Sequence, residues 1–263
     1  KGEAVCLGAF MKAVNVKELP KPLNESFNFD ANITARVDGA DVKDLELRFG
    51  KTKVRGDINI KFGKTPNIVA RLETKHVNLD KWLNNEVIEP PSVSRGASGA
   101  GNTNPVVLGK ETAKKLGKRK HFFIPTSLQA SLKLTADAMT LRDRVIRNGF
   151  VNAELSNGEI TLSQASAQFP GGSDMALFGF VTAKDGEPQF EGELESTVND
   201  LRSVLDWLGH DLESVGKDRL RKLTLAARVF ASPNQLKMAN INLRFDSSKL
   251  SGGVTVALRK RPS

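Results

Sequence analysis

Three histidines and one cysteine are the residues of this chain best suited to bind a metal ion or to act as a nucleophile. His76, His121 and His210 are scattered, and none forms a metal-binding motif with a neighbouring ligand-type residue. Cys6 lies in the apolar stretch 4–14, where a thiol is more often part of a core than a nucleophile. A single cysteine also excludes internal disulfides and cysteine-based metal cages. The sequence therefore predicts no metal site and no catalytic thiol.

Two other patterns could support catalysis, but both lack the context that catalysis requires. Residues 96–101, GASGAG, have the glycines of a phosphate-binding loop without a preceding strand, a following helix or a Walker lysine. Glu191, Glu193 and Glu195 alternate along one segment, which is typical of a solvated strand face rather than of an acid–base pair. We therefore expect no enzymatic activity and no cofactor.

Residues 110–120 form a basic cluster that could contact the phosphate groups of lipids or nucleic acids. One acidic residue, Glu111, lies among its cations, which are Lys110, Lys114, Lys115, Lys118, Arg119 and Lys120. No nucleic-acid-binding fold motif accompanies the cluster, so nucleic acid is not an expected partner. We predict contact with an anionic membrane surface, with an ordinary solvated loop as the alternative.

The elements that must position these residues are mainly β-strands. In residues 27–37, apolar side chains alternate with polar ones without interruption, which predicts a long strand with one apolar face. The alternation returns over residues 45–72, where polar turns separate the apolar runs as hairpins. We expect an antiparallel meander, because parallel strands would require helical crossovers.

One β-pattern is repeated along the chain. Its first and last copies align without a gap and carry apolar residues at the same seven positions, whereas the middle copy has three extra residues. The copies are residues 45–62, 165–183 and 241–258, each with a glycine that we interpret as a turn residue, Gly56, Gly179 and Gly252. Such units must stack to bury their apolar faces. The expected fold is mainly β with short helices (α+β), in which repeated antiparallel β-meanders form an elongated, curved, groove-like sheet.

Short helical segments divide these units. Residues 77–85 and 198–209 break the alternation, and in the second Asn199 is predicted to cap a helix that Gly209 ends. The predicted units are a first helix-plus-β repeat (1–83), a Pro/Gly/Ser-rich and then basic loop or linker (84–120), a second β repeat ending in a helix (121–209) and a third, truncated β repeat (210–263). The strands predicted in the second repeat are 128–139, 145–155, 159–168, 174–183 and 189–197.

Length and composition bound the class of protein. The 263 residues carry a net charge of +9, and 39% of them are hydrophobic, which suits one or two folded domains. No apolar run approaches the roughly 20 residues that span a bilayer.

The chain begins with lysine, and the β-pattern stops after the third strand of the last repeat. We interpret the chain as a fragment of a longer protein whose sheet would continue.

The β repeats resemble those of the AsmA family. The resemblance is carried by VDGADVKDLELRFGKTKVRGDINIKF and PNIVARLETKHVNLDKWL in the first unit, and by the run from Ala130 to Gly209 in the second. The family's copies consist of a strand, an L-x-L strand, a G-x-L turn, a further strand and a short helix, with an insert comparable to residues 84–120. The resemblance covers nearly the whole chain and includes no catalytic residues.

The resemblance implies a large envelope protein of Gram-negative bacteria, anchored in the inner membrane by an N-terminal helix and extending into the periplasm. TamB-like relatives are thought to form β-grooves that carry phospholipid between membranes. The resemblance therefore implies phospholipid or another acyl lipid as ligand, a membrane contacted through a segment outside this chain, and envelope proteins as partners.

From the alternation and the resemblance together, we expect a module that binds acyl chains along an apolar β-groove for phospholipid transport between envelope membranes. The residues expected to line the groove are Phe27, Phe29, Ile33, Val37, Leu47, Phe49, Ile58, Ile60, Leu132, Leu134, Leu155, Leu162, Phe169, Leu194, Leu225, Leu243, Phe245, Val254 and Val256. One alternative is a structural or assembly module for outer-membrane protein biogenesis or envelope organisation, without lipid carriage. A third hypothesis is an anionic-polymer binder that acts through residues 110–120. Alternation alone does not determine which face of the sheet is concave.

Overall fold

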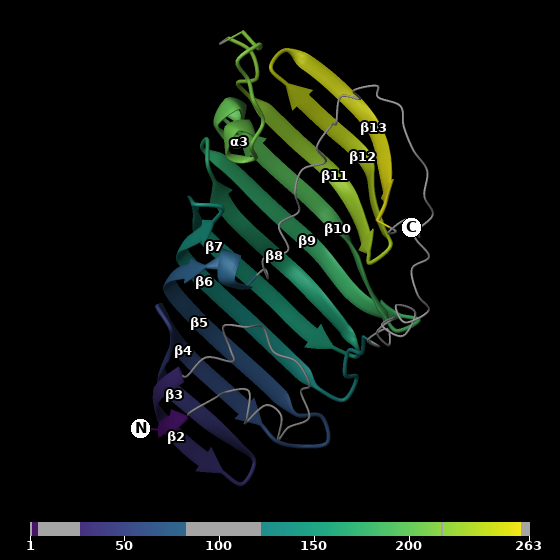
Figure 1. Ribbon diagram of the computed structural model, residues 1–263. Helices are drawn as coiled ribbons and strands as arrows, with labels where there is room; N and C mark the ends of the chain where they lie inside the picture. Colours follow the sequence, from purple (N-terminus) through teal and green to yellow (C-terminus); the bar gives the residue numbers. More distant parts are fainter. Residues whose placement is uncertain (1, 5–26, 83–121, 217, 259–263) are drawn as a thin grey trace, which may run out of the picture.

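A single sheet of 13 strands makes up most of the molecule, and its strands follow one another in chain order (Figure 1). The computed structural model describes residues 2–4, 27–82, 122–216 and 218–258. The strands are β1 (Gly2–Ala4), β2 (Phe27–Arg36), β3 (Gly39–Phe49), β4 (Thr52–Lys61), β5 (Asn67–Asn78), β6 (Gln129–Leu141), β7 (Arg144–Ser156), β8 (Glu159–Phe169), β9 (Ser173–Lys184), β10 (Glu187–Val198), β11 (Leu223–Ser232), β12 (Gln235–Phe245) and β13 (Ser248–Ala257). Two short helices, α2 (Leu79–Trp82) and α3 (Leu201–Trp207), follow β5 and β10. The predicted β-rich fold with short helices is confirmed.

Local sequence patterns located the elements of the second repeat closely. The predicted strand ends differ from those of β6 to β10 by no more than two residues. The predicted cap of the following helix is wrong, because Asp200 occupies the N-cap position of α3. The Asn199 side-chain amide instead donates a hydrogen bond to the Gly172 carbonyl at 2.9 Å. Gly209 follows the C-cap residue with a φ of +86°, as expected of a glycine that ends a helix.

The strands form three antiparallel blocks, β1–β5, β6–β10 and β11–β13, but the first two blocks meet in a parallel pair. Ile68 of β5 lies opposite Ala130 of β6, and the register runs in the same direction along both strands. The antiparallel meander predicted for residues 27–72 is confirmed in β2 to β5, and the parallel pair lies at the junction of the first two blocks. A parallel neighbour requires the chain to return to the opposite end of the sheet, and residues 79–128 lie between the two strands.

The two faces of the sheet differ sharply in polarity. Two register rows cross every strand from β2 to β13 and contain only apolar residues and glycine. The first row is Ile33, Val42, Ile58, Ala70, Leu132, Ala153, Leu162, Gly179, Gly192, Val229, Met238 and Val254. The second is Ala35, Ala40, Ile60, Ile68, Ala130, Leu155, Ile160, Val181, Phe190, Ala231, Leu236 and Val256. Residues paired across strands point to the same side, so each row lies on one face. Within each strand the two rows are two residues apart, so both rows lie on the same face.

β-Bulges interrupt the register in the middle of several strands. Asp44, Asn148 and Asn240 adopt positive φ values of +53°, +51° and +52° at three of these irregularities. Asp and Asn tolerate this left-handed conformation better than other non-glycine residues. Each extra residue shifts the alternation by one position and bends its strand, so the apolar side chains stay on the same face through the bend.

The three repeat glycines lie in the middle of strands, which corrects the interpretation of them as turn residues. Gly56, Gly179 and Gly252 belong to β4, β9 and β13, and each lies next to a register shift. A Cβ atom on Gly56 would lie 1.9 Å from the Arg71 carbonyl oxygen of the neighbouring strand. A Cβ atom on Gly179 would lie 2.3 Å from the carbonyl oxygen of Glu191. At Gly56 and Gly179, glycine is therefore required because adjacent backbones approach closely at the bulges, whereas the Cβ position of Gly252 has no atom within 4 Å.

Candidate functional site: the inner apolar face

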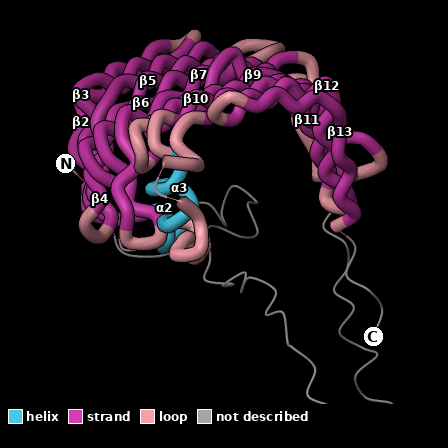
Figure 2. The backbone as a smooth tube through the Cα atoms, turned by 90° about the horizontal axis from the view of Figure 1, so that it is seen from above, coloured by secondary structure: helices cyan, strands magenta, loops and turns pink. Residues whose placement is uncertain are grey.

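The apolar rows lie on the concave side of a strongly curved sheet. Seen from above, the strands form an arch, and α2 and α3 lie inside it (Figure 2). The Trp207 ring of α3 packs against Phe169 of β8, with ring centroids 5.9 Å apart. Phe169 lies on the same side of β8 as Ala165, whose register neighbours are Val151 and Leu177. We call this concave surface, which contains the two apolar rows, the inner apolar face.

Most residues predicted to line a groove lie on this face. They are Phe29, Ile33, Leu47, Phe49, Ile58, Ile60, Leu132, Leu134, Leu155, Leu162, Phe169, Leu194, Leu225, Leu243, Phe245, Val254 and Val256. Phe27 is opposite Phe49 in the register of β2 and β3. Val37 follows β2 in the turn to β3 and is fully exposed, so it does not belong to the face. The alternation therefore identified one continuous surface.

Several inner-face residues were missing from that prediction, including Ile68, Ile160, Val181, Phe190 and Leu236 of the second row. The signal that could have found them is the spacing of two along each strand, counted from a residue whose face is known. In β9 this signal is hidden, because Leu177 and Val181 point inward while the intervening Phe178 and Phe180 point outward.

Three hydroxyl groups of the inner apolar face form hydrogen bonds with nearby backbone carbonyls. Thr74 donates a hydrogen bond to the Lys53 carbonyl at 2.9 Å, and Ser196 donates one to the Asp174 carbonyl at 3.1 Å. Ser173 is buried and bonds the Pro170 carbonyl. These groups are therefore satisfied by the backbone, and the surface can bind apolar groups without leaving its own polar atoms unpaired.

Many side chains of this face retain contact with solvent. Ile146, Ala227 and Val229 are buried, but most residues of the two rows are only half-buried. At the margins, Ile33 is 61% exposed and Val254 is 47% exposed. With strands about 4.8 Å apart, rows that cross β2 to β13 extend for roughly 50 Å. Exposed apolar surface of this extent is typical of a site for a protein, a membrane or an apolar ligand.

α3 covers one end of the inner apolar face, and residues 122–126 lie beside the hairpin turns at the opposite end of β7 to β10. At one end α3 is fixed by Trp207, whose indole N–H donates to the Leu141 carbonyl at 3.3 Å, and by an ion pair between Arg144 and Asp206 at 3.2 Å. At the other end, the Phe122 amide donates to the Gly186 carbonyl at 2.8 Å, and Ile124 is buried. α3 has only seven residues, so it covers a small part of the sheet.

Replacing Trp207 by alanine should detach α3 from the inner apolar face. The change removes the ring contact with Phe169 and the hydrogen bond to Leu141, and we expect it to lower the free energy of unfolding by about 2 kcal/mol. Hydrogen exchange should become faster across Leu201–Trp207 and remain slow in β8. Leu208→Ala is the control, because Leu208 is adjacent and 43% exposed. Equal protection of α3 in both variants would contradict this role of Trp207.

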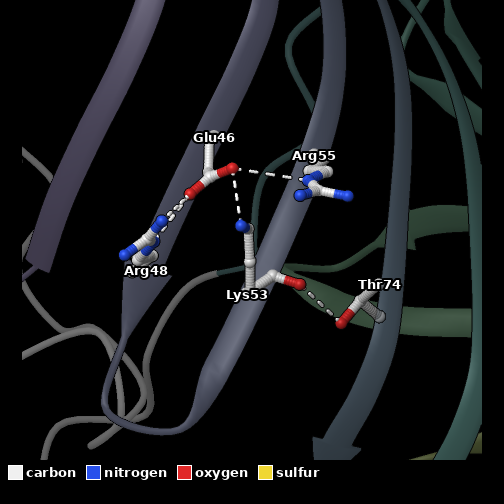
Figure 3. A network of polar contacts seen from close by, with 5 residues as sticks. All are labelled: Glu46, Arg48, Lys53, Arg55 and Thr74. Atoms are coloured by element: carbon white, nitrogen blue, oxygen red, sulfur yellow. Dashed lines mark hydrogen bonds and ion pairs between the residues drawn. The ribbon is translucent and has the colours of Figure 1, made fainter.

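The outer face carries mainly polar and charged side chains, some of which form ion pairs (Figure 3). Glu46 of β3 accepts a hydrogen bond from Arg48 Nε at 2.6 Å and lies 2.6 Å from Lys53 Nζ and 3.4 Å from Arg55 Nε. The hydrogen bonds from Lys53 and then Arg48 lower the pKa of Glu46 from its ordinary value of 4.5 to about 2. A lowered pKa means that this carboxylate contributes stability above pH 4.5, and that the contribution is lost as the pH falls towards 2.

Lys53→Ala should raise the pKa of Glu46 towards its ordinary value, because the hydrogen bond from Lys53 is the largest cause of its lowering. The carboxyl carbon chemical shift of Glu46, followed by NMR during an acid titration, measures this pKa directly. Arg55→Ala should change it less, because Arg55 is the most distant of the three cations. A pKa that is the same in the wild type and in Lys53→Ala would contradict the proposed ion pair.

The hollows found on the described surface lie mainly on the outer face. One of them, with a volume of about 590 Å³, is lined by acidic and basic side chains in similar number, among them Glu46, Arg55, Asp57, Arg71 and Lys133. Such mixed charge favours neither an anion nor a cation. Within the described residues, no group of three or more His, Cys, Asp or Glu side chains could hold a metal ion. The outer face is therefore the weaker candidate site.

The remaining predicted residues do not assemble into a chemical site. His76 bonds the Thr140 hydroxyl at 3.0 Å, and His210 lies after α3. Cys6, His121 and the basic cluster 110–120 lie outside the described residues. Among the helices that the structure describes, none combines the length and apolar character needed to span a membrane.

Comparisons with protein-family models, with curated proteins and with solved structures each found no match for this chain.

Proposed function

We propose that this chain binds the acyl chains of lipids along the inner apolar face, as the periplasmic part of an AsmA-like protein that carries phospholipid between envelope membranes. In this proposal the full-length protein is anchored in the inner membrane. The observation that carries the proposal is the pair of unbroken apolar rows from β2 to β13 on the concave side of the sheet. An ordinary folded core would bury such rows, whereas most of these residues are half-buried.

Magnitudes support a site for acyl chains. Each buried CH₂ group contributes about 0.8 kcal/mol, so one chain can be held without specific polar contacts. One acyl chain spans half of the hydrocarbon core of a bilayer, which is about 15 Å. The two apolar rows extend for roughly 50 Å. The face therefore has room for more than one chain, and the apolar side chains of its two rows favour binding by tails rather than by headgroups.

Native mass spectrometry and extraction of the chain purified without detergent test this proposal. We expect acyl lipids bound to the folded chain, and we expect a delipidated sample to recover them from phospholipid vesicles. Carriage is measured separately, as transfer of a labelled phospholipid from donor to acceptor vesicles. A chain that retains no lipid and takes none up would refute the proposal and favour a structural or assembly module.

The basic cluster 110–120 would bring the inner apolar face to an anionic membrane surface. Lys114→Glu combined with Lys115→Glu and Lys118→Glu should weaken sedimentation with vesicles that contain phosphatidylglycerol, because each basic residue contributes about 1 kcal/mol near such a surface. Binding of a soluble fatty acid should be unchanged. Equal loss of both activities would contradict separate roles for the cluster and the inner apolar face.

A further inference from the structure

Two phenylalanine side chains flank a glutamate on the outer face, in the middle of the sheet. Phe180 of β9, Glu191 of β10 and Phe230 of β11 are consecutive in one register row, so their side chains project from the same side. Because strands are about 4.8 Å apart, Phe180 and Phe230 are roughly 10 Å from each other, with Glu191 between them. Phe180 is 37% exposed. The row therefore places an aromatic side chain on each side of a carboxylate.

A hollow of about 180 Å³ lies over this row, and we call it the aromatic hollow. Its lining includes Phe180, Glu191 and Phe230, to which Gln189 and Ser232 add an amide and a hydroxyl group. The Glu191 carboxylate forms no ion pair or hydrogen bond with any residue that the structure describes. The aromatic hollow therefore combines two phenyl rings with a negative charge that this part of the chain does not neutralise.

The adjacent register row shows how this face neutralises a carboxylate beside a phenylalanine. Phe178, Glu193 and Arg228 repeat the arrangement two residues along the same three strands. The Arg228 guanidinium pairs with the Glu193 carboxylate at 3.8 Å. In the row of Glu191, the position of the arginine is taken by Phe230. The two rows therefore differ in that the cation for Glu191 must come from outside the described chain.

The ring of Phe230 already attracts a cation. Lys237 of β12 is opposite Phe230 in the register, and its Nζ lies 5.6 Å from the ring centroid. This distance is within the roughly 6 Å over which cation–π attraction acts. Lys237 is on the side of Phe230 away from Glu191, because β11 lies between β10 and β12. The side of the ring that faces the aromatic hollow is available to a second cation.

We propose that the aromatic hollow binds a small organic cation, with a methylated ammonium group over Glu191 and between the rings of Phe180 and Phe230. Methyl groups on the nitrogen spread the positive charge over a surface that packs against aromatic rings, and the carboxylate neutralises the charge. Glu159 pairs with Thr182 at the margin of the aromatic hollow and adds a second negative charge. A cation that carries its own phosphate is therefore disfavoured. The site is on the opposite side of the sheet from the inner apolar face, so it does not depend on lipid binding there.

Titration of the whole chain with choline, followed through the NMR signals of the Phe180 and Phe230 rings, tests the site. We expect a Kd on the order of 10 mM at low salt, from two exposed cation–π contacts and one ion pair. The uncharged isostere 3,3-dimethyl-1-butanol should bind at least fivefold more weakly, and so should phosphocholine. Equal binding of the uncharged isostere would overturn the proposal. Tighter binding of phosphocholine would also overturn it, in favour of a zwitterionic lipid headgroup.

Matched variants locate the cation. Glu191→Gln and Phe180→Leu should each weaken choline binding about threefold. Lys237→Gln should strengthen it, because the competing ammonium group leaves the ring of Phe230. Glu193→Gln is the control and should leave the Kd unchanged, since Glu193 is paired with arginine outside the aromatic hollow.

The same samples separate this site from the inner apolar face. All four variants should keep the wild-type Kd for a fluorescent fatty acid, with the fold checked by circular dichroism. Equal effects of Glu191→Gln and Glu193→Gln on choline binding would overturn the aromatic hollow as the cation site, whether or not the chain binds lipid.

Discussion

Replacing Gly56 by alanine is expected to lower the free energy of unfolding by about 3 kcal/mol or more. The new Cβ would lie 1.9 Å from the Arg71 carbonyl oxygen, which belongs to the backbone of β5 and cannot rotate away. The φ of +152° adds strain, because residues with a side chain rarely adopt it. Separation of β4 from β5 would also break the apolar rows that cross these strands. Urea denaturation followed by circular dichroism measures the loss.

Two matched variants separate the steric collision from the backbone strain. Gly63 has a φ of +157° with nothing within 4 Å, so Gly63→Ala should cost about 1 kcal/mol through strain alone. Gly179→Ala should resemble Gly56→Ala, since its Cβ would lie 2.3 Å from the Glu191 carbonyl oxygen. If all three variants lost the same stability, close approach of the strands would not be the reason for the repeated glycines.

Polar substitutions on the inner side of β9 should weaken acyl-chain binding at least tenfold. Leu177→Gln combined with Val181→Gln removes two apolar side chains from the inner apolar face, one of them in the row through Ile160 and Phe190. A tenfold change in affinity corresponds to about 1.4 kcal/mol, which is less than the burial of one leucine contributes. The measurement is the Kd of a fluorescent fatty acid, with the fold checked by circular dichroism.

The same strand provides the control. Phe178→Gln combined with Phe180→Gln makes comparable changes in the outward-pointing residues between Leu177 and Val181. We expect this variant to keep the wild-type Kd, although it removes larger apolar side chains. Equal weakening by both double variants would mean that binding depends on the general stability of β9, and it would argue against the inner apolar face as the lipid site.

Local patterns were sufficient to predict the strands, because a strand with one apolar face must alternate with a period of two. Residues 27–37 alternate without interruption, and β2 covers Phe27–Arg36. The same reasoning placed β6 to β10, and most of the residues that it assigned to a groove lie on the inner apolar face. In β9 the alternation did not show which side chains point inward, because Leu177, Phe178, Phe180 and Val181 are all apolar. The inward side is defined there by the pairing with the neighbouring strands.

Short segments of the chain were sufficient to predict a mainly β-fold with one apolar face, because alternation is a property of local sequence. The packing of the strands shows that this face is concave, that β5 and β6 are parallel, and that Gly56, Gly179 and Gly252 lie at bulges rather than turns. Curvature, strand direction and close backbone approach arise from contacts between segments distant in sequence. A period of two is the same whichever way the sheet curves, so the pattern of one strand determines neither the curvature of the sheet nor the direction of its neighbours.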